Sequence, residues 1–224
     1  MNGDVEIVVA DDPARVVAQR LAEAARRGRS IVLTGGSTPG DAYSLAAELE
    51  PDWSGAELWW GDERCVPPEH EWSNYGTAKA ALLDRLAAQP RAVHRMHGEL
   101  GKDAGADAYE EELDGVTLDL VLLGMGRDGH VASLYPNQPT LEERARRVVG
   151  AEARLEPFVD RITMTIPALR SGHEVLFLIA GADKADAVAR AFAADPDPAT
   201  PASLVRSESG RTTAVLDRAA AARL

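Results

Sequence analysis

The stretch VLLGMGRDGHVASLYP at residues 121–136 combines a glycine-rich turn with an acid and an imidazole. Its three glycines have the G-x-G-x-x-G spacing that is typical of a dinucleotide-binding turn. Such a turn needs a sustained helix after the third glycine, whereas Pro136 and Pro139 would end that helix early. Asp128 stands two residues before His130, where a carboxylate can fix the tautomer of an imidazole and raise its basicity. We therefore interpret this segment as a catalytic loop.

A second segment with chemical potential is IVLTGGSTPGDAY at residues 31–43. An apolar strand leads into Gly36, Ser37 and Thr38, and Pro39 then marks the expected start of a helix. Free N–H groups at a helix start attract an anion, and the two hydroxyl groups offer further donors. The segment lacks the lysine of a Walker motif, so it predicts a phosphate cradle of another kind. A strand-to-helix turn capped by Ser or Thr is the structural alternative.

Three charged residues, Asp62, Glu63 and Arg64, follow another apolar strand. Asp62 is a candidate base or orienting group, and Arg64 is a candidate for gripping an oxyanion with two hydrogen bonds. A solvated run of charges is the alternative explanation.

Two further cations lie near strand ends. Arg161 opens an apolar run, and Lys184 lies in the first turn of an expected helix, where the positive end of the helix dipole disfavours a lysine. A bound phosphate would remove that penalty, although each residue by itself could be an ordinary surface cation. Together with the glycine-rich segment, they would form a compact basic site.

The elements that must position these residues alternate along the chain. The expected strands are Val5–Val9, Ser30–Thr34, Glu57–Trp60, Leu118–Leu123, Arg161–Thr165, Glu174–Ile179 and Thr213–Leu216. The expected helices are Pro13–Arg27, Pro39–Leu49, Asn74–Ala88, Ala104–Leu113 and Ala182–Ala193. This alternation indicates an α/β fold with a mostly parallel central sheet and helices on both faces. Ligands of such sheets bind beyond the carboxyl ends of the strands. We expect residues 1–224 to form a single domain.

The composition limits the partners. The chain has 24 Lys and Arg against 36 Asp and Glu, a formal net charge of −12, so its average surface repels nucleic acid and anionic membranes. Cys65 is the single cysteine, which excludes an intrachain disulfide. The first residues lack a basic signal-peptide region, and no apolar run approaches the roughly 18 residues that span a bilayer. We expect a cytoplasmic protein that acts on a small molecule, with no nucleic-acid or membrane partner.

The motifs GGSTP, GDER, SNYG, LLGMGRDGHVASLYP, RITMTIPAL and AGADKA occur in this order over most of the chain. In order and spacing this set resembles the 6-phosphogluconolactonases. The resemblance implies a Rossmann-like three-layer α/β fold. It also implies hydrolysis of 6-phospho-D-glucono-1,5-lactone in the oxidative pentose phosphate pathway, with neither a metal ion nor an organic cofactor.

The resemblance also assigns roles to residues. It implies that His130 is the main catalytic group, supported by Asp128, and that Asp62 lies in the same site. The substrate and its phosphate would be held by Gly36, Ser37, Thr38, Arg64, Arg161 and Lys184. We expect neutral His130 to remove a proton from a water molecule that attacks the lactone carbonyl. Ser133 lies nearby but lacks the G-x-S-x-G setting of a nucleophile.

Two other functions remain as alternatives. Related glucosamine-6-phosphate deaminases carry a glutamate before the proline that closes the DGH motif, and this chain has Tyr135 there. A sugar-phosphate sensor without catalysis is the other alternative, and the intact DGH motif disfavours it. The role of Asp62 stays open between orienting sugar hydroxyls and orienting His130. The sequence also leaves open which of Arg64, Arg127, Arg161 and Arg170 contact phosphate, and it is compatible with a monomer.

Overall fold

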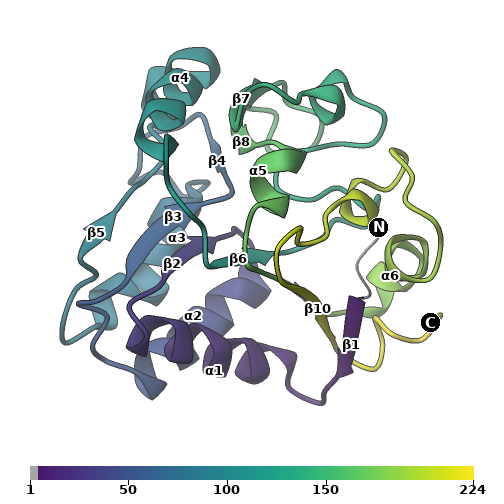
Figure 1. Ribbon diagram of the computed structural model, residues 1–224, viewed down its shortest axis with the longest axis horizontal. Coiled ribbons are helices and arrows are strands. Elements are labelled where there is room, and N and C mark those ends of the chain that lie inside the picture. Colours follow the sequence, from purple (N-terminus) through teal and green to yellow (C-terminus); the bar gives the residue numbers. More distant parts are fainter. Residues whose placement is uncertain (1–4) are drawn as a thin grey trace.

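A computed structural model describes residues 5–224, and its centre is a seven-stranded sheet (Figure 1). The strand order is β1-β10-β9-β6-β2-β3-β5, and every neighbouring pair is parallel. The strands are β1 Val5–Val9, β2 Ser30–Leu33, β3 Glu57–Trp60, β5 Ala92–Val93, β6 Leu120–Leu123, β9 Glu174–Ile179 and β10 Arg211–Leu216. The predicted parallel α/β sheet is therefore confirmed.

Helices cover both faces of this sheet. They are α1 Pro13–Arg26, α2 Ser37–Leu49, α3 Asn74–Ala81, α4 Lys102–Leu113, α5 Ile166–Arg170 and α6 Ala185–Phe192. Figure 1 shows α1 and α2 side by side beneath the sheet, with α4 and α5 on the opposite side. Every residue of β2, β6 and β9 is buried, as near-continuous apolar strands between two layers should be. No described helix has both the length and the apolar character needed to cross a membrane.

A second sheet lies above the first, and the sequence did not predict it (Figure 1). It has three antiparallel strands in the order β4-β8-β7, namely β4 Asp62–Arg64, β8 Arg161–Met164 and β7 Val148–Ala151. The segment at Arg161 is a strand as expected, but its partners belong to this smaller sheet. An apolar pattern predicts that a strand is buried without identifying its neighbour, so the error concerned pairing and not secondary structure.

Several helix boundaries differ from the prediction, including the start of α2, the end of α3, the start of α4 at Lys102 and both ends of α6. Helix α2 begins at Ser37, two residues before Pro39, because Gly36 takes the capping position with φ 114°. Helix α3 ends at Ala81, whereas the sequence predicted a helix to residue 88. The backbone leaves the helical region at Leu82, with φ −122° and ψ −70°, and the side chain of Leu82 is fully buried. Burial of this side chain accompanies the early turn.

A buried carboxylate joins the second sheet to helix α3. Glu63 is 2% exposed and accepts hydrogen bonds from the backbone N–H groups of Arg64, Asn74 and Tyr75 at 2.7–2.8 Å. It also accepts one from the Ser73 hydroxyl at 3.0 Å. Burial raises the pKa of Glu63, and these four hydrogen bonds oppose the shift. Glu63 therefore fixes strand β4, with Asp62 and Arg64, against the start of α3.

We expect Glu63→Ala to destabilise the protein by about 2–4 kcal/mol, because it leaves several buried donors at the start of α3 without an acceptor. Glu57→Ala is the matched control, since Glu57 forms a surface ion pair with Arg91 and should cost less than about 1 kcal/mol. Urea unfolding followed by circular dichroism measures both values. Equal losses in the two variants would contradict this role of Glu63.

Candidate active site

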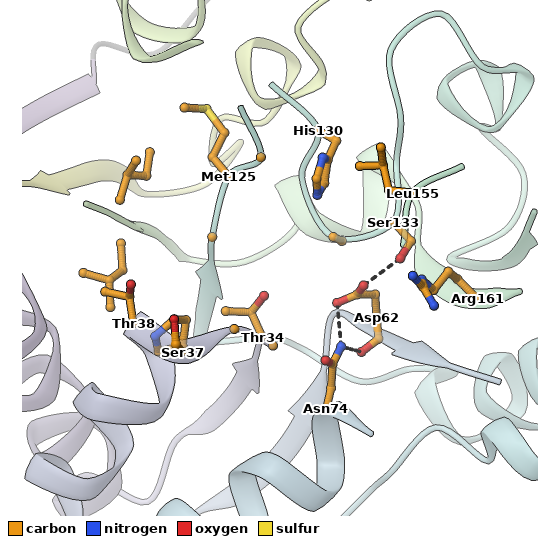
Figure 2. A pocket seen from close by; sticks show the side chains of 18 of the residues that line it. Thr34, Ser37, Thr38, Asp62, Asn74, Met125, His130, Ser133, Leu155 and Arg161 are labelled. Atoms are coloured by element: carbon orange, nitrogen blue, oxygen red, sulfur yellow. Dashed lines mark hydrogen bonds between the residues drawn. The ribbon is translucent and has the colours of Figure 1, made fainter. Parts of the chain in front are cut away.

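A cavity of about 470 Å³ opens at the carboxyl ends of the central strands. The segments that follow β2, β6 and β9 contribute to its wall, as the topology of a parallel sheet requires. Eight of the predicted site residues line it: Gly36, Ser37, Thr38, Asp62, Arg64, His130, Arg161 and Lys184. Figure 2 shows Ser37 and Thr38 on one side, Asp62 and Arg161 on the other, and His130 pointing into the space between them.

The ninth predicted residue, Asp128, lies beside His130. Its Oδ1 atom is 2.6 Å from Nδ1 of the imidazole and also accepts the backbone N–H of His130 at 3.1 Å. With Nδ1 donating to the carboxylate, Nε2 carries the lone pair and is the nitrogen free to accept a proton. The spacing D-x-H thus produces the oriented imidazole that the sequence predicted.

Two of the loop glycines are needed for this arrangement. A Cβ atom on Gly126 would overlap the imidazole of His130 and the carboxylate of Asp128. Gly129 has φ +89°, and a Cβ atom there would also press against Thr200. In the described chain, Gly129 does not lead directly into a helix, and the first helical turn after it is the short 3₁₀ turn Pro139–Glu142. The glycines therefore shape a turn around the acid and the imidazole, and the structure supports no dinucleotide-binding turn here.

The carboxylate of Asp128 is suited to stay ionised. Partial burial pulls the pKa of Asp128 upward, but the hydrogen bonds and charge of His130 outweigh it and hold that pKa below the ordinary value. An ionised Asp128 favours the Nδ1–H tautomer and would stabilise a positive charge on the ring.

The glycine-rich segment presents an open helix start. Gly36 occupies the capping position of α2 and no side chain caps the helix, so the N–H groups of its first turn stay available. Ser37 and Thr38 form that first turn and line the cavity. The positive end of a 13-residue helix faces the same space, which suits an anion.

Three cationic side chains reach the cavity from two strands and one 3₁₀ turn. Arg64 on β4 and Arg161 on β8 are directly paired across the small sheet. Arg161 is only 3% exposed; its Nη2 donates to Pro157 O at 3.0 Å, while its Nη1 is buried and lacks a partner among the described residues. Lys184 enters from the turn before α6. The acidic protein thus has a local basic site.

The sequence left open which of four arginines could contact phosphate, and the structure shows which of them line the cavity. Arg64 and Arg161 line the cavity. Arg127 is an exposed side chain paired with Asp183 at 3.8 Å, and Arg170 pairs with Glu208 at 3.1 Å. Neither Arg127 nor Arg170 contributes to the cavity wall.

Asp62 is joined to the loop that carries His130 through Ser133. The Ser133 hydroxyl donates to Asp62 Oδ2 at 2.6 Å, and Asn74 Nδ2 donates to Asp62 Oδ1 at 3.2 Å and to Asp62 O at 2.9 Å (Figure 2). Within the described chain, no hydrogen bond joins Asp62 to His130. Of the two roles considered for Asp62, a direct hydrogen bond to His130 is therefore not observed.

Sequence reasoning missed two of these contacts. Asn74 belongs to the SNYG motif, but nothing in that motif shows that its amide reaches a carboxylate on another element. Ser133 appeared only as a rejected nucleophile, whereas its hydroxyl is already engaged by Asp62. Tyr135, the residue that departs from the deaminase pattern, packs beside His130 with ring centroids 5.2 Å apart.

Comparison with known proteins shows to which family this chain belongs. Residues 6–214 match the model of the glucosamine-6-phosphate isomerases/6-phosphogluconolactonase family. The chain belongs to this family. A Streptomyces coelicolor protein named 6-phosphogluconolactonase is 38% identical, with alignment over 100% of this chain and 93% of the relative. A Mycobacterium tuberculosis protein of the same name is 39% identical over 99% of this chain and 96% of the relative.

Solved structures of the family share the fold. A 6-phosphogluconolactonase from Trypanosoma cruzi superimposes with a TM-score of 0.85 at 28% identity, covering 100% of this chain and 98% of that one. A monomeric glucosamine-6-phosphate deaminase has a TM-score of 0.83 at 20% identity, covering 99% and 100% of the two chains, and this likeness concerns the fold alone. Solved structures with either name thus share the fold of this chain.

The lowered pKa of Asp128 makes a prediction about acid stability. A carboxyl group with a lowered pKa in the folded state adds stability above its unfolded pKa of about 3.9, and that stability is lost as pH falls through the folded value. We expect Asp128→Asn to be less stable than the wild type near pH 6, with the difference shrinking below about pH 4. Thermal unfolding across this pH range measures it, and a pH-independent difference would contradict the ionic origin of the effect.

Proposed function

We propose that this protein hydrolyses 6-phospho-D-glucono-1,5-lactone to 6-phospho-D-gluconate, the second step of the oxidative pentose phosphate pathway. The observation that carries the proposal is the imidazole of His130, oriented by Asp128 and facing a basic cavity, in a chain whose curated relatives are named 6-phosphogluconolactonase. We further propose that the whole chain works as one domain, since the family model extends over residues 6–214.

The cavity offers complementary groups for such a substrate. The N–H groups at the start of α2, the hydroxyls of Ser37 and Thr38, and the side chains of Arg161 and Lys184 would hold the phosphate. Arg64 would bind at the same site and help to neutralise negative charge on the substrate. A volume of about 470 Å³ accommodates a phosphorylated six-membered ring.

The proposed chemistry is general base catalysis by His130. Nε2 removes a proton from a water molecule as its oxygen forms a bond to C1 of the lactone. The tetrahedral oxyanion is stabilised by hydrogen-bond donors of the cavity, such as Arg64. The bond between C1 and the ring oxygen then breaks, and the imidazolium returns its proton to the departing oxygen. One water is consumed, and no covalent enzyme intermediate forms.

In this proposal Asp62 acts through position and not through proton transfer. Its two carboxylate oxygens are occupied by Ser133 and Asn74, so it links the catalytic loop to strand β4 and helix α3. The proposal also separates the protein from the deaminase branch, because Tyr135 occupies the position where deaminases carry a glutamate. Incubation with glucosamine 6-phosphate should therefore release no ammonia, whereas freshly generated lactone should disappear faster than its spontaneous hydrolysis.

His130→Ala should lower kcat by about 10²–10⁴-fold, since it removes the proposed general base and the proton donor to the leaving oxygen. Binding of 6-phosphogluconate, measured by calorimetry, should change little because the phosphate contacts remain. The lactone decay assay, corrected for the uncatalysed rate, measures kcat. A wild-type kcat in this variant would refute the role of His130 in the mechanism, but it would not contradict the proposed binding of the substrate.

Lys184→Ala should raise KM about tenfold or more with little change in kcat, because its contact with phosphate exists in both the ground state and the transition state. Arg127→Ala is the matched control: it removes a cation paired with the same Asp183, but from outside the cavity. Its kinetic constants should match the wild type. Unchanged KM in the Lys184 variant would remove this residue from the phosphate site.

A further inference from the structure

A second cavity, of about 330 Å³, opens at the opposite end of the central sheet. Leu120, Glu174 and Arg211, the first residues of β6, β9 and β10, line it, as does Arg29, which precedes β2. Helix α1 contributes Arg20, Glu23 and Ala24, its C-cap residue is Arg27, and His173 and Gly210 complete the wall. We call this cavity the amino-end pocket. The length of the strands separates it from the candidate active site.

The charge of the amino-end pocket is opposite to that of the chain. Its wall carries four arginines and two glutamates, which gives a formal charge of +2 with His173 neutral, in a chain whose net charge is −12. The arginines come from helix α1 and from two strand starts that are far apart in the sequence. The tertiary structure therefore concentrates positive charge here.

Two of these arginines have unused hydrogen-bonding capacity. Arg20 Nη1 lies 3.6 Å from Glu174 Oε1, and Arg29 Nη1 lies 3.9 Å from Asp119 Oδ1. Neither side chain donates a hydrogen bond to any described residue. Both side chains are nevertheless largely buried, with 30% of Arg20 and 31% of Arg29 exposed. A guanidinium group has five N–H donors in a planar fork, the geometry that matches a phosphate.

The carboxylates of the pocket are already held by other arginines. Arg211 Nη2 donates to Glu174 Oε2 at 2.7 Å, and Arg27 Nη2 donates to Glu23 Oε1 at 2.5 Å. Arg211 reaches Glu174 because Gly210 lets the start of β10 approach His173, where a Cβ atom would overlap His173 O. An anion would therefore leave these two ion pairs intact, and at Arg20 and Arg29 it would compete only with the longer contacts to Glu174 Oε1 at 3.6 Å and Asp119 Oδ1 at 3.9 Å.

We propose that the amino-end pocket is a second anion site, which binds the phosphate group of a small molecule through Arg20 and Arg29. A volume of about 330 Å³ exceeds the space needed for phosphate itself, so the natural ligand would carry a further group beyond the phosphate. The site does not depend on the proposed lactonase activity, because it shares no residue with the candidate active site.

Inorganic phosphate is the probe, titrated into ¹⁵N-labelled protein with backbone amide NMR as the readout and sodium chloride at matched ionic strength as the reference. We expect saturable shifts of the amides around residues 29, 173 and 211, in addition to any at the start of α2. Arg29→Gln should weaken the first set at least tenfold and leave the second unchanged, and Arg20→Gln should do the same. Arg26→Gln is the matched control, since Arg26 lies on the same helix but pairs with Glu50 outside the pocket.

A variant that removes an acidic group instead of an arginine should have the opposite effect on phosphate binding. Glu23→Gln removes an acidic group from the pocket and releases Arg27, so it should tighten phosphate binding severalfold. Glu23 and Arg27 form an exposed pair, so this change should leave the fold intact. The proposal is overturned if the shifts are confined to the active-site loops, if chloride reproduces them, or if Arg29→Gln and Arg26→Gln bind phosphate equally at the amino-end pocket.

Discussion

The hydrogen bond between Asp128 Oδ1 and His130 Nδ1, at 2.6 Å, is the interaction on which the candidate site depends. It favours the tautomer with the proton on Nδ1, which leaves the lone pair of Nε2 free in a side chain that lines the cavity. The bond forms because β6 ends at Leu123 and the loop after it curls tightly enough to bring two side chains from neighbouring positions together. Gly126 leaves room for the imidazole and Gly129 supplies the positive φ, so the glycines serve the acid–imidazole pair.

The surrounding structure extends this local arrangement across two sheets. Ser133, three residues beyond His130, donates to Asp62 on β4, and Glu63 on the same strand holds the first residues of α3. Loop, small sheet and helix are thus connected by buried hydrogen bonds, which are costly to break singly. The small sheet also carries Arg64 and Arg161 into the cavity. Its position over the central sheet closes one side of the site.

Positive charge is concentrated at two places in this acidic protein. A chain of net charge −12 does not attract a phosphate through its average surface, so a phosphate ligand would require a local concentration of donors. One lies at the carboxyl ends of the strands, where a helix start and three cationic side chains converge. The amino-end pocket is the other, with its four arginines. The two pockets lie at opposite ends of the strands of the central sheet.

The sequence predicted most strands of the central sheet, five of the helices and most of the residues of the candidate site, but not β4, β5, β7 or α5. Alternating apolar strands and helices predicted the parallel sheet. Motifs near strand ends, together with the family resemblance, predicted eight residues that line one cavity, and those that follow β2, β6 and β9 meet there because parallel strands end on the same side of a sheet. Local spacing was sufficient for Asp128 and His130, which are two residues apart. Only the tertiary structure decided the long-range pairs: β8 with β4, Asp62 with Ser133 and Asn74, and the arginines of the amino-end pocket. Most of these contacts join residues on different elements and far apart in the sequence. An apolar pattern encodes burial but not the neighbour against which a strand or a side chain is buried.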